Sequence, residues 1–410
     1  MLYLCTRFRK RQKMKKILFL ICLVLLAACH KDDDNETVQQ TRTVLIYMSA
    51  ENKLSYDSEY DLAEIYTGSK SLSENDNLLV YCDRAKKDEL PWLARIVDGR
   101  LQDSVSIVDM QIYDEDYYSS YGVIFEKVLS YAFSHYPATG GYGLTLWGHA
   151  NGWLKMDSLV YTRAYGVDNG TNSAQTDAGL WLNMPTIRRV LEKQPHLDFI
   201  LADCCNFMCL ESLYELRNAA DYIVGSPAEI PAAGAPYDKM VPEMFKRQYA
   251  AKSIMTAYAN AYKDYLPLSV VKLSEMDAVA AATNKVLKAI YSRLDTEYPE
   301  MAGLIHYYNE RKASYLPAYN IFYDAGDFIL RFAEEEEYKE WKQVLDRAVT
   351  DKVIAPTWEV NKNWSTHYSD FTMTEERYHG VSMFVPQELG YYVQYNEDIK
   401  DLLWYWKVWK

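Results

Sequence analysis

Cysteine is scarce in this chain of 410 residues. Seven cysteines occur, three of them in an N-terminal leader, and the other four are Cys82, Cys204, Cys205 and Cys209. Four thiols are too few for a disulfide scaffold, and without a CxxC pair they lack the spacing of a structural zinc site. No internal repeat is present either. We therefore predict a globular core that holds no metal site, rather than a cross-linked mini-domain or a repeat array.

A basic excess is missing outside the first 28 residues. The formal net charge is −13, and these 28 residues hold seven basic and no acidic side chains. The remainder carries 37 basic against 57 acidic groups, a net charge of −20. Such an acidic surface argues against nucleic acid as a partner and would attract basic peptides.

The chain also lacks an apolar run of the length that a membrane-spanning helix requires. Residues 17–26 are apolar, follow a basic stretch and precede small residues, which is typical of a secretion signal. The run ends Leu26-Ala27-Ala28-Cys29, which resembles a bacterial lipobox and implies cleavage before Cys29 and lipidation of its thiol. The alternative is an ordinary signal peptide followed by a chance cysteine. Residues 32–34 resemble the acidic tag of surface-exposed lipoproteins.

These features predict a division of the chain. We expect a lipoprotein signal peptide at 1–28, a flexible tether at 29–42, a globular core at 43–275 and a C-terminal part at 276–410 packed on that core. The anchor at Cys29 predicts a secreted lipoprotein attached to the outer membrane. The acidic tag predicts that this lipoprotein is exposed on the cell surface.

Apolar strands alternate with amphipathic helices from residue 43 onward. Strands are expected at 43–48, 77–83, around Leu144, around Phe199, at 222–226 and at 268–273; helices are expected at 52–66, 122–134, 184–193, 208–219 and 251–262. This order predicts an α/β fold with a mostly parallel central sheet and helices on both faces. Helical additions follow at 276–294 and 325–335. Residues 154–180 are expected to form a long loop, and 381–385 a late strand that returns to the sheet.

Two predicted strands end in reactive side chains. One ends at Trp147-Gly148-His149, and the other at Asp203-Cys204-Cys205. Ligands bind beyond the carboxyl ends of parallel strands, so these side chains are expected to meet there. A histidine near its ordinary pKa can activate a thiol as nucleophile, and the helix expected after Cys205 would stabilise a thiolate. The alternative is a hydrogen-bonded structural histidine and an inert buried cysteine.

The ordered motifs resemble the clostripain family of cysteine peptidases, a caspase-like group. The resemblance spans residues 43–386 and rests on the strand and acidic turn at 44–52, Trp147-Gly148-His149-Ala150-Asn151-Gly152-Trp153, Asp203 and Cys205 ahead of Glu211, and the segments 226–237, 323–328 and 380–386. It implies a caspase-like fold in which His149 and Cys205 form a catalytic dyad. It further implies an oxyanion hole built from the backbone of Ala150 and Cys205.

The resemblance implies endopeptidase action after arginine or lysine. Asp203, two residues before the nucleophile, would pair with the basic P1 side chain at the floor of its pocket. The alternative reading of Asp203 is a helix cap or a turn-forming aspartate. Family members commonly cut themselves between the histidine and cysteine strands, and Arg163 and Lys155 in the loop 154–180 are the candidates. No cofactor is required, although some members respond to calcium, for which no loop spacing is visible.

Three departures from the family pattern keep other functions open. Ala150 replaces a glycine and would adopt a positive φ less readily, Cys204 replaces an alanine, and Ala235 replaces a tryptophan. One rival is a degenerate surface lipoprotein that binds peptides or glycans without cleaving them. The other is a caspase-like hydrolase with a different P1 preference.

Overall fold

The structure is a computed structural model, and it describes residues 40–114, 116–154, 164–170, 179–262, 265–296, 298–310, 319–356, 358, 371–388 and 392–410. Within it, Thr41–Lys410 forms one compact unit. The predicted signal peptide, Cys29, Lys155 and Arg163 lie outside the described residues, and the boundaries at 28, 42 and 275 stay predictions. None of the helices in the described ranges combines the length and apolar character that spanning a bilayer requires.

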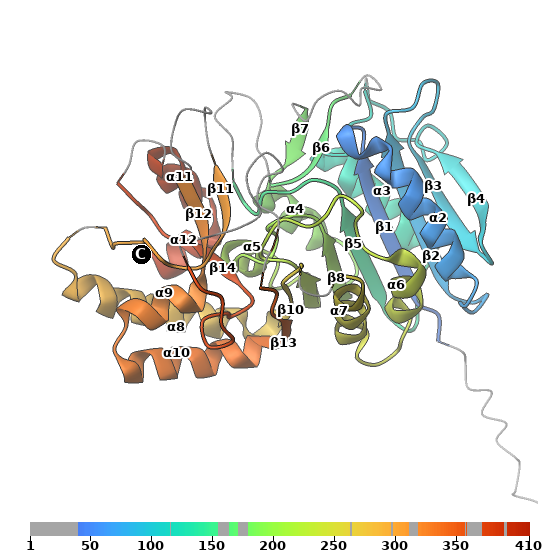
Figure 1. Cartoon of the computed structure of the whole chain (residues 1–410). Coiled ribbons are helices and arrows are strands. Elements are labelled where there is room, and N and C mark those ends of the chain that lie inside the picture. The colour runs from blue at the N-terminus through green and yellow to red at the C-terminus, as the bar shows by residue number, and fades with distance from the viewer. Residues whose placement is uncertain are drawn as a thin grey trace, which may run out of the picture. The chain divides into compact units, whose positions relative to one another are not determined.

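A nine-stranded sheet forms the centre of this unit (Figure 1). In spatial order its strands are β13 (Val349–Val353), β10 (Leu268–Lys272), β9 (Ala220–Gly225), β8 (Leu197–Asp203), β5 (Tyr142–Trp147), β1 (Thr43–Ala50), β2 (Asn77–Arg84), β3 (Trp92–Val97) and β4 (Arg100–Ser106). The five neighbouring strands from β9 to β2 run parallel to one another. Each of the two outer strands on either side pairs antiparallel with its inner neighbour. The predicted α/β fold with a mostly parallel sheet is confirmed.

Helices cover both faces of the sheet because the central strands are nearly continuous apolar runs, whose successive side chains point to opposite faces. On one face lie α2 (Asp57–Ser69), α6 (Tyr237–Met244) and α7 (Ala250–Ala261), packed on a core that includes Val44 and Leu201. On the other lie α3 (Gly122–His135), α4 (Met184–Leu191), α5 (Leu210–Glu215) and α8 (Met276–Arg293), packed on a core that includes Leu45 and Ile200. The 3-10 turns η1 (Lys53–Ser55) and η2 (Leu273–Glu275) precede α2 and α8.

The late strand does not return to the central sheet, so that prediction is wrong. β14 (Ser382–Phe384) instead joins β11 (His306–Glu310) and β12 (Tyr319–Asp324) in a separate sheet. The reason is that β13 already occupies the edge beside β10. Around this sheet lie α9 (Ala325–Phe332), α10 (Glu335–Ala348), α11 (Tyr392–Asp398), the 3-10 turn η3 (Ile399–Asp401) and α12 (Leu403–Val408). The Ser382 amide donates to the Met208 carbonyl, which fastens β14 to the segment after Cys205 (2.9 Å).

Some predicted elements change length. The described part of the loop 154–180 holds an antiparallel pair, β6 (Tyr165–Asp168) and β7 (Leu180–Leu182), which is too short to show a period in the sequence. The helix predicted at 325–335 is α9, which ends at Phe332. A new helix, α10, begins at Glu335 behind a capping box formed by Glu334 and Glu337.

Candidate active site

Strands β5 and β8 are neighbours and leave the sheet at the same level. Trp147 pairs with Asp203 in the parallel register, and the Gly148 amide donates to the Asp203 carbonyl (3.3 Å). His149 and Cys205 each follow two residues after that last pair. The structure therefore brings the two predicted reactive residues to adjacent positions at the carboxyl edge of the sheet, where open α/β sheets bind their ligands.

The alternation of side chains separates the two neighbouring cysteines. Cys204 is fully buried in the core on the α3–α4 side, and this burial raises the pKa of its thiol well above the usual value. Cys205 is only partly buried, and its Sγ accepts a hydrogen bond from the Ile230 amide (3.4 Å). Because a reactive thiol must ionise and be reached by substrate, Cys205 and not Cys204 has the surroundings of a nucleophile.

Two glycines shape the histidine loop. Gly148 has φ 145° and Gly152 has φ 59°, and an added Cβ would lie 3.0 Å from the Ser49 carbonyl oxygen and 2.7 Å from the Phe322 ring, respectively. The His149 carbonyl accepts from the Gly166 amide of β6 (2.8 Å). Close packing at both glycines and the hydrogen bond to β6 therefore fix the backbone of this loop and with it the position of His149.

Ala150 causes none of the strain expected of a residue in place of glycine. It is absent from the residues with positive φ, because Gly148 and Gly152 carry the left-handed turns on either side. Ala150 forms a bridge with Tyr165, and within the described ranges its amide has no hydrogen-bond acceptor. The backbone at Ala150 is therefore free of the distortion that replacing a glycine was expected to cause.

Asn206 directly follows Cys205 at a position where the family pattern has leucine, a departure from which no role could be inferred. It has φ 55°, a left-handed conformation that asparagine tolerates better than most residues, and its amide donates to the Ala228 carbonyl (2.9 Å). Strained backbone of this kind gathers at functional sites. The signal in the sequence was an asparagine immediately after the nucleophile.

Asp203 is buried and points to the opposite side of the sheet from Cys204. Its Oδ2 accepts from the Tyr237 hydroxyl (2.7 Å) and the Ala235 amide (3.3 Å), and its Oδ1 accepts from the Tyr258 hydroxyl (2.8 Å). All three donors come from later segments, so Asp203 does not act as the cap of the following helix. A carboxylate offers about four acceptor positions, which leaves one for a ligand.

A second carboxylate, Asp61 of α2, lies beside Asp203 and was missed from the sequence. The Trp147 Nε1 donates to Asp61 Oδ2 (2.6 Å), and burial together with the Asp203 charge raises the pKa of Asp61 to about 8. Gly234 has φ 64°, and an added Cβ would lie 3.0 Å from Asp61 Oδ2 and 3.5 Å from Asp203 Oδ2. The feature of the sequence that could have indicated Asp61 is its position as an acidic residue on the buried face of an amphipathic helix.

Three further carboxylates gather near the same edge. Oxygen atoms of Glu51, Asp83 and Asp168 all lie within 4.8 Å of one another, and all three residues are buried. The Ser119 amide donates to Asp83 (3.2 Å), and the Ser119 hydroxyl donates to Asp168 (2.6 Å). Burial and the mutual proximity of the two aspartates raise the pKa of Asp83 well above its usual value. Carboxylate oxygens are the ligands that calcium prefers.

The sequence and the fold that carry this site are similar to those of known proteins. A model described as the clostripain family matches residues 46–410. Two solved structures are each 28% identical to the chain: a secreted C11 cysteine protease from Bacteroides thetaiotaomicron in complex with an irreversible peptide inhibitor, and an inactive zymogen C11 protease from Parabacteroides distasonis. Their TM-scores are 0.70 and 0.71; each alignment covers 90% of this chain and, respectively, 99% and 98% of the other.

A third structure, a secreted C11 cysteine protease from Bacteroides thetaiotaomicron called iotapain, is 16% identical, with a TM-score of 0.66 over 90% of this chain and 99% of that one. It supports the fold alone. A comparison with curated proteins finds no match. The matches confirm the caspase-like arrangement of the sheet and the prediction of a cysteine peptidase.

Proposed function

The chain belongs to the clostripain family of cysteine peptidases, and on that premise we propose that it is a secreted, lipid-anchored endopeptidase that cleaves after arginine or lysine. The observation that carries this proposal is the matched exit of His149 and Cys205 from adjacent strands, with the buried Asp203 two residues before the thiol. The acidic surface favours basic protein or peptide substrates.

In the proposed reaction, His149 accepts the thiol proton of Cys205, and the thiolate sulfur attacks the scissile carbonyl. The amides of Ala150 and Cys205 donate to the oxyanion that forms. His149 then gives its proton to the leaving amine as the C–N bond breaks, leaving a thioester on Cys205. A water molecule, deprotonated by His149, hydrolyses that thioester and restores the thiol. A dyad therefore completes the cycle without a third residue.

The P1 preference is proposed to come from two carboxylates rather than one. Asp203 and Asp61 both lie close to the Cβ position of Gly234, where together they would present oxygens to a cationic side chain. An arginine or lysine cation would offset the cost of holding two buried carboxylates close together.

A panel of fluorogenic peptides ending in Arg, Lys, Asp or Asn tests the proposal. The panel is run on the parent and on Cys205→Ala. Cleavage confined to Arg and Lys is expected from the parent alone. Cleavage after Asp or Asn instead would favour the hydrolase with another P1 preference, and no turnover by the parent would favour the peptide-binding lipoprotein.

We propose no cofactor for the reaction itself, because the chain supplies both the nucleophile and the proton carrier. Calcium is a proposal for stability alone, with Glu51, Asp83 and Asp168 as the residues whose oxygens suit it. The same panel, run after dialysis against EDTA and again with added calcium, should give equal rates at a temperature where the enzyme stays folded.

Self-processing between the two catalytic strands is a further part of the proposal. Arg163 is the preferred cut site and Lys155 the second, since both are basic and lie between His149 and Cys205 in the chain. The purified parent is expected to separate into two fragments on a denaturing gel, whereas Cys205→Ala stays one chain. Arg163→Gln should retard the cut or move it to Lys155. Cutting of the Cys205→Ala protein at the parental rate would contradict this proposal.

The lipid anchor is proposed from the leader, whose sequence ends in the lipobox-like Leu26-Ala27-Ala28-Cys29. Cys29→Ser should abolish incorporation of labelled fatty acid and move the protein from the detergent phase to the aqueous phase in a phase-partition assay, because acyl chains provide the membrane affinity. Cys82→Ser, which alters a buried thiol of β2, serves as the matched control. Equal labelling of the Cys29→Ser protein would exclude lipidation at this residue.

A further inference from the structure

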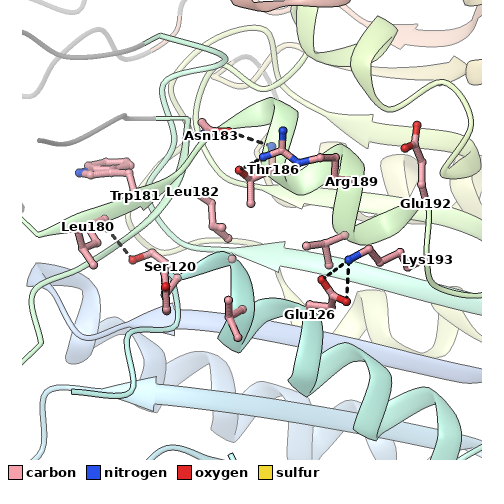
Figure 2. Close-up of a pocket in the computed structure, with 14 residues that line it drawn as sticks. Ser120, Glu126, Leu180, Trp181, Leu182, Asn183, Thr186, Arg189, Glu192 and Lys193 are labelled. Atoms are coloured by element: carbon pink, nitrogen blue, oxygen red, sulfur yellow. Dashed lines mark hydrogen bonds and ion pairs between the residues drawn. The ribbon is translucent and has the colours of Figure 1, made fainter. Parts of the chain in front are cut away.

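A cavity of about 620 Å³ lies between β7, the start of α3 and the length of α4, and it reaches the neighbourhood of His149 through Trp181 (Figure 2). Trp181 of β7 lines it, and the Trp181 ring lies 6.4 Å from the His149 ring, centroid to centroid. Both helices lead into parallel strands, α3 into β5 and α4 into β8, so they begin at the edge of the sheet where His149 and Cys205 emerge. The cavity and the reactive pair therefore share one edge.

The walls of the cavity are held in place by protein contacts. The Ser120 hydroxyl donates to the Leu180 carbonyl (2.8 Å), which joins β7 to the start of α3. A Cβ at Gly122 would lie 2.6 Å from the Thr186 methyl group, so α3 and α4 approach closely at their first turns. The cavity is consequently formed before any ligand arrives, which lowers the cost of binding one.

The order of the strands assigns the cavity to one side of the scissile bond. The donors to Asp203 and to the Cys205 sulfur come from Ala235, Tyr237, Tyr258 and Ile230, all in segments that follow β9. The acyl half of a substrate, anchored by its P1 cation, must lie on that side. β5 lies on the other side of β8, so His149 stands away from β9. The leaving half passes His149, which protonates its amine, and next reaches Trp181.

The lining changes character along the cavity. Figure 2 shows Trp181 and Leu180 at one end, and the ion pair between Lys193 and Glu126 at the other. Tyr121 and Val123 also line the cavity, and both apolar side chains remain 46% exposed. Exposed apolar surface inside a formed cavity beside a reactive residue marks a place where a ligand buries apolar groups.

We propose that this cavity is a subsite for the leaving half of the substrate, and that it binds a large apolar side chain within two residues after the scissile bond. The inference rests on the proposed peptidase function. It adds a second specificity element to the P1 carboxylates: the enzyme selects a basic residue followed closely by a bulky apolar one.

Two substrate types with one common acyl half test the inference. One is an internally quenched peptide, Ala-Ala-Arg followed by Phe-Leu-Gly or by Ser-Ser-Gly. The other is the Ala-Ala-Arg coumarylamide, which has no amino acids after the scissile bond. The parent is expected to cleave the Phe-Leu peptide with a kcat/KM about 10-fold or more above that of the Ser-Ser peptide. Burial of one apolar side chain in a pocket provides discrimination of about this size.

Tyr121→Ser and Val123→Ser should reduce this ratio about 3-fold or more each. Serine suits the start of α3, where Tyr121 is the cap residue without a side-chain hydrogen bond, so folding should persist. Val393→Ser, at a valine of α11 that is 52% exposed, is the control and should keep the parental ratio. Equal cleavage of both peptides by the parent, or an unchanged ratio in both serine variants, overturns the inference while coumarylamide turnover upholds the peptidase. Absence of any turnover overturns the proposed function and this subsite together.

Discussion

Replacing Cys205 with alanine is expected to lower kcat/KM for Arg and Lys peptides by about 10⁴-fold or more, since removal of a nucleophile leaves only binding and oxyanion contacts. The loss should appear in kcat, with binding of a P1-Arg peptide retained in a calorimetric titration. The loss in kcat is expected because Cys205 is the partly exposed thiol at the strand end beside His149. Binding is expected to persist because removing one sulfur atom changes the surrounding residues little.

Cys204→Ala is the matched control one residue away. Its thiol is fully buried in the core and its raised pKa keeps it protonated, so kcat/KM should stay within about 3-fold of the parent. The thermal midpoint is expected to drop by a few degrees because a small cavity remains, at a cost of about 1 kcal/mol. Loss of activity in Cys204→Ala with activity retained in Cys205→Ala would transfer the nucleophile to the other cysteine.

Asp203→Asn is expected to lower kcat/KM for Arg and Lys peptides by about 10²–10³-fold, as removing one partner of a buried charge pair does. The asparagine is isosteric and its oxygen can still accept from Tyr237 or Tyr258, so the fold should persist. Asp221→Asn, at an exposed aspartate paired with His196, controls for the substitution itself. If Asp203→Asn cleaves Arg peptides at the parental rate, Asp203 does not read the P1 residue.

The pH dependence of cation binding reports on Asp61. Burial raises its pKa to about 8, so the empty site holds Asp61 protonated below that pH, and binding a guanidinium there must release the proton. Affinity for agmatine should therefore rise with pH up to about 8 and then level off. The titration uses the Cys205→Ala protein to exclude thiol ionisation. Asp61→Asn should flatten the profile, and an unaltered profile in that variant would place Asp61 outside the P1 site.

Much of the fold could be predicted because its elements are long and locally periodic. The strands β1, β2, β5 and β8 were predicted nearly to their observed bounds, since buried parallel strands are continuous apolar runs. The strand expected at 268–273 is β10, whereas the outer strands β3, β4 and β13 and the β6–β7 pair were missed. Pairing at an edge depends on which neighbour is free: β13 pairs with β10 at one edge of the central sheet, and 382–384 pairs in another sheet.

The sequence by itself determined that a histidine and a cysteine end two apolar strands, because strand periodicity and the strand-end position of ligand sites are local rules. Only the tertiary structure decided what surrounds them. Asp61 reaches Asp203 from a helix 142 residues earlier in the chain, and Trp181 of β7 places its ring 6.4 Å from the His149 ring. Contacts of this kind arise from packing between distant segments, and neither residue carries a pattern in its own neighbourhood that reveals its partner.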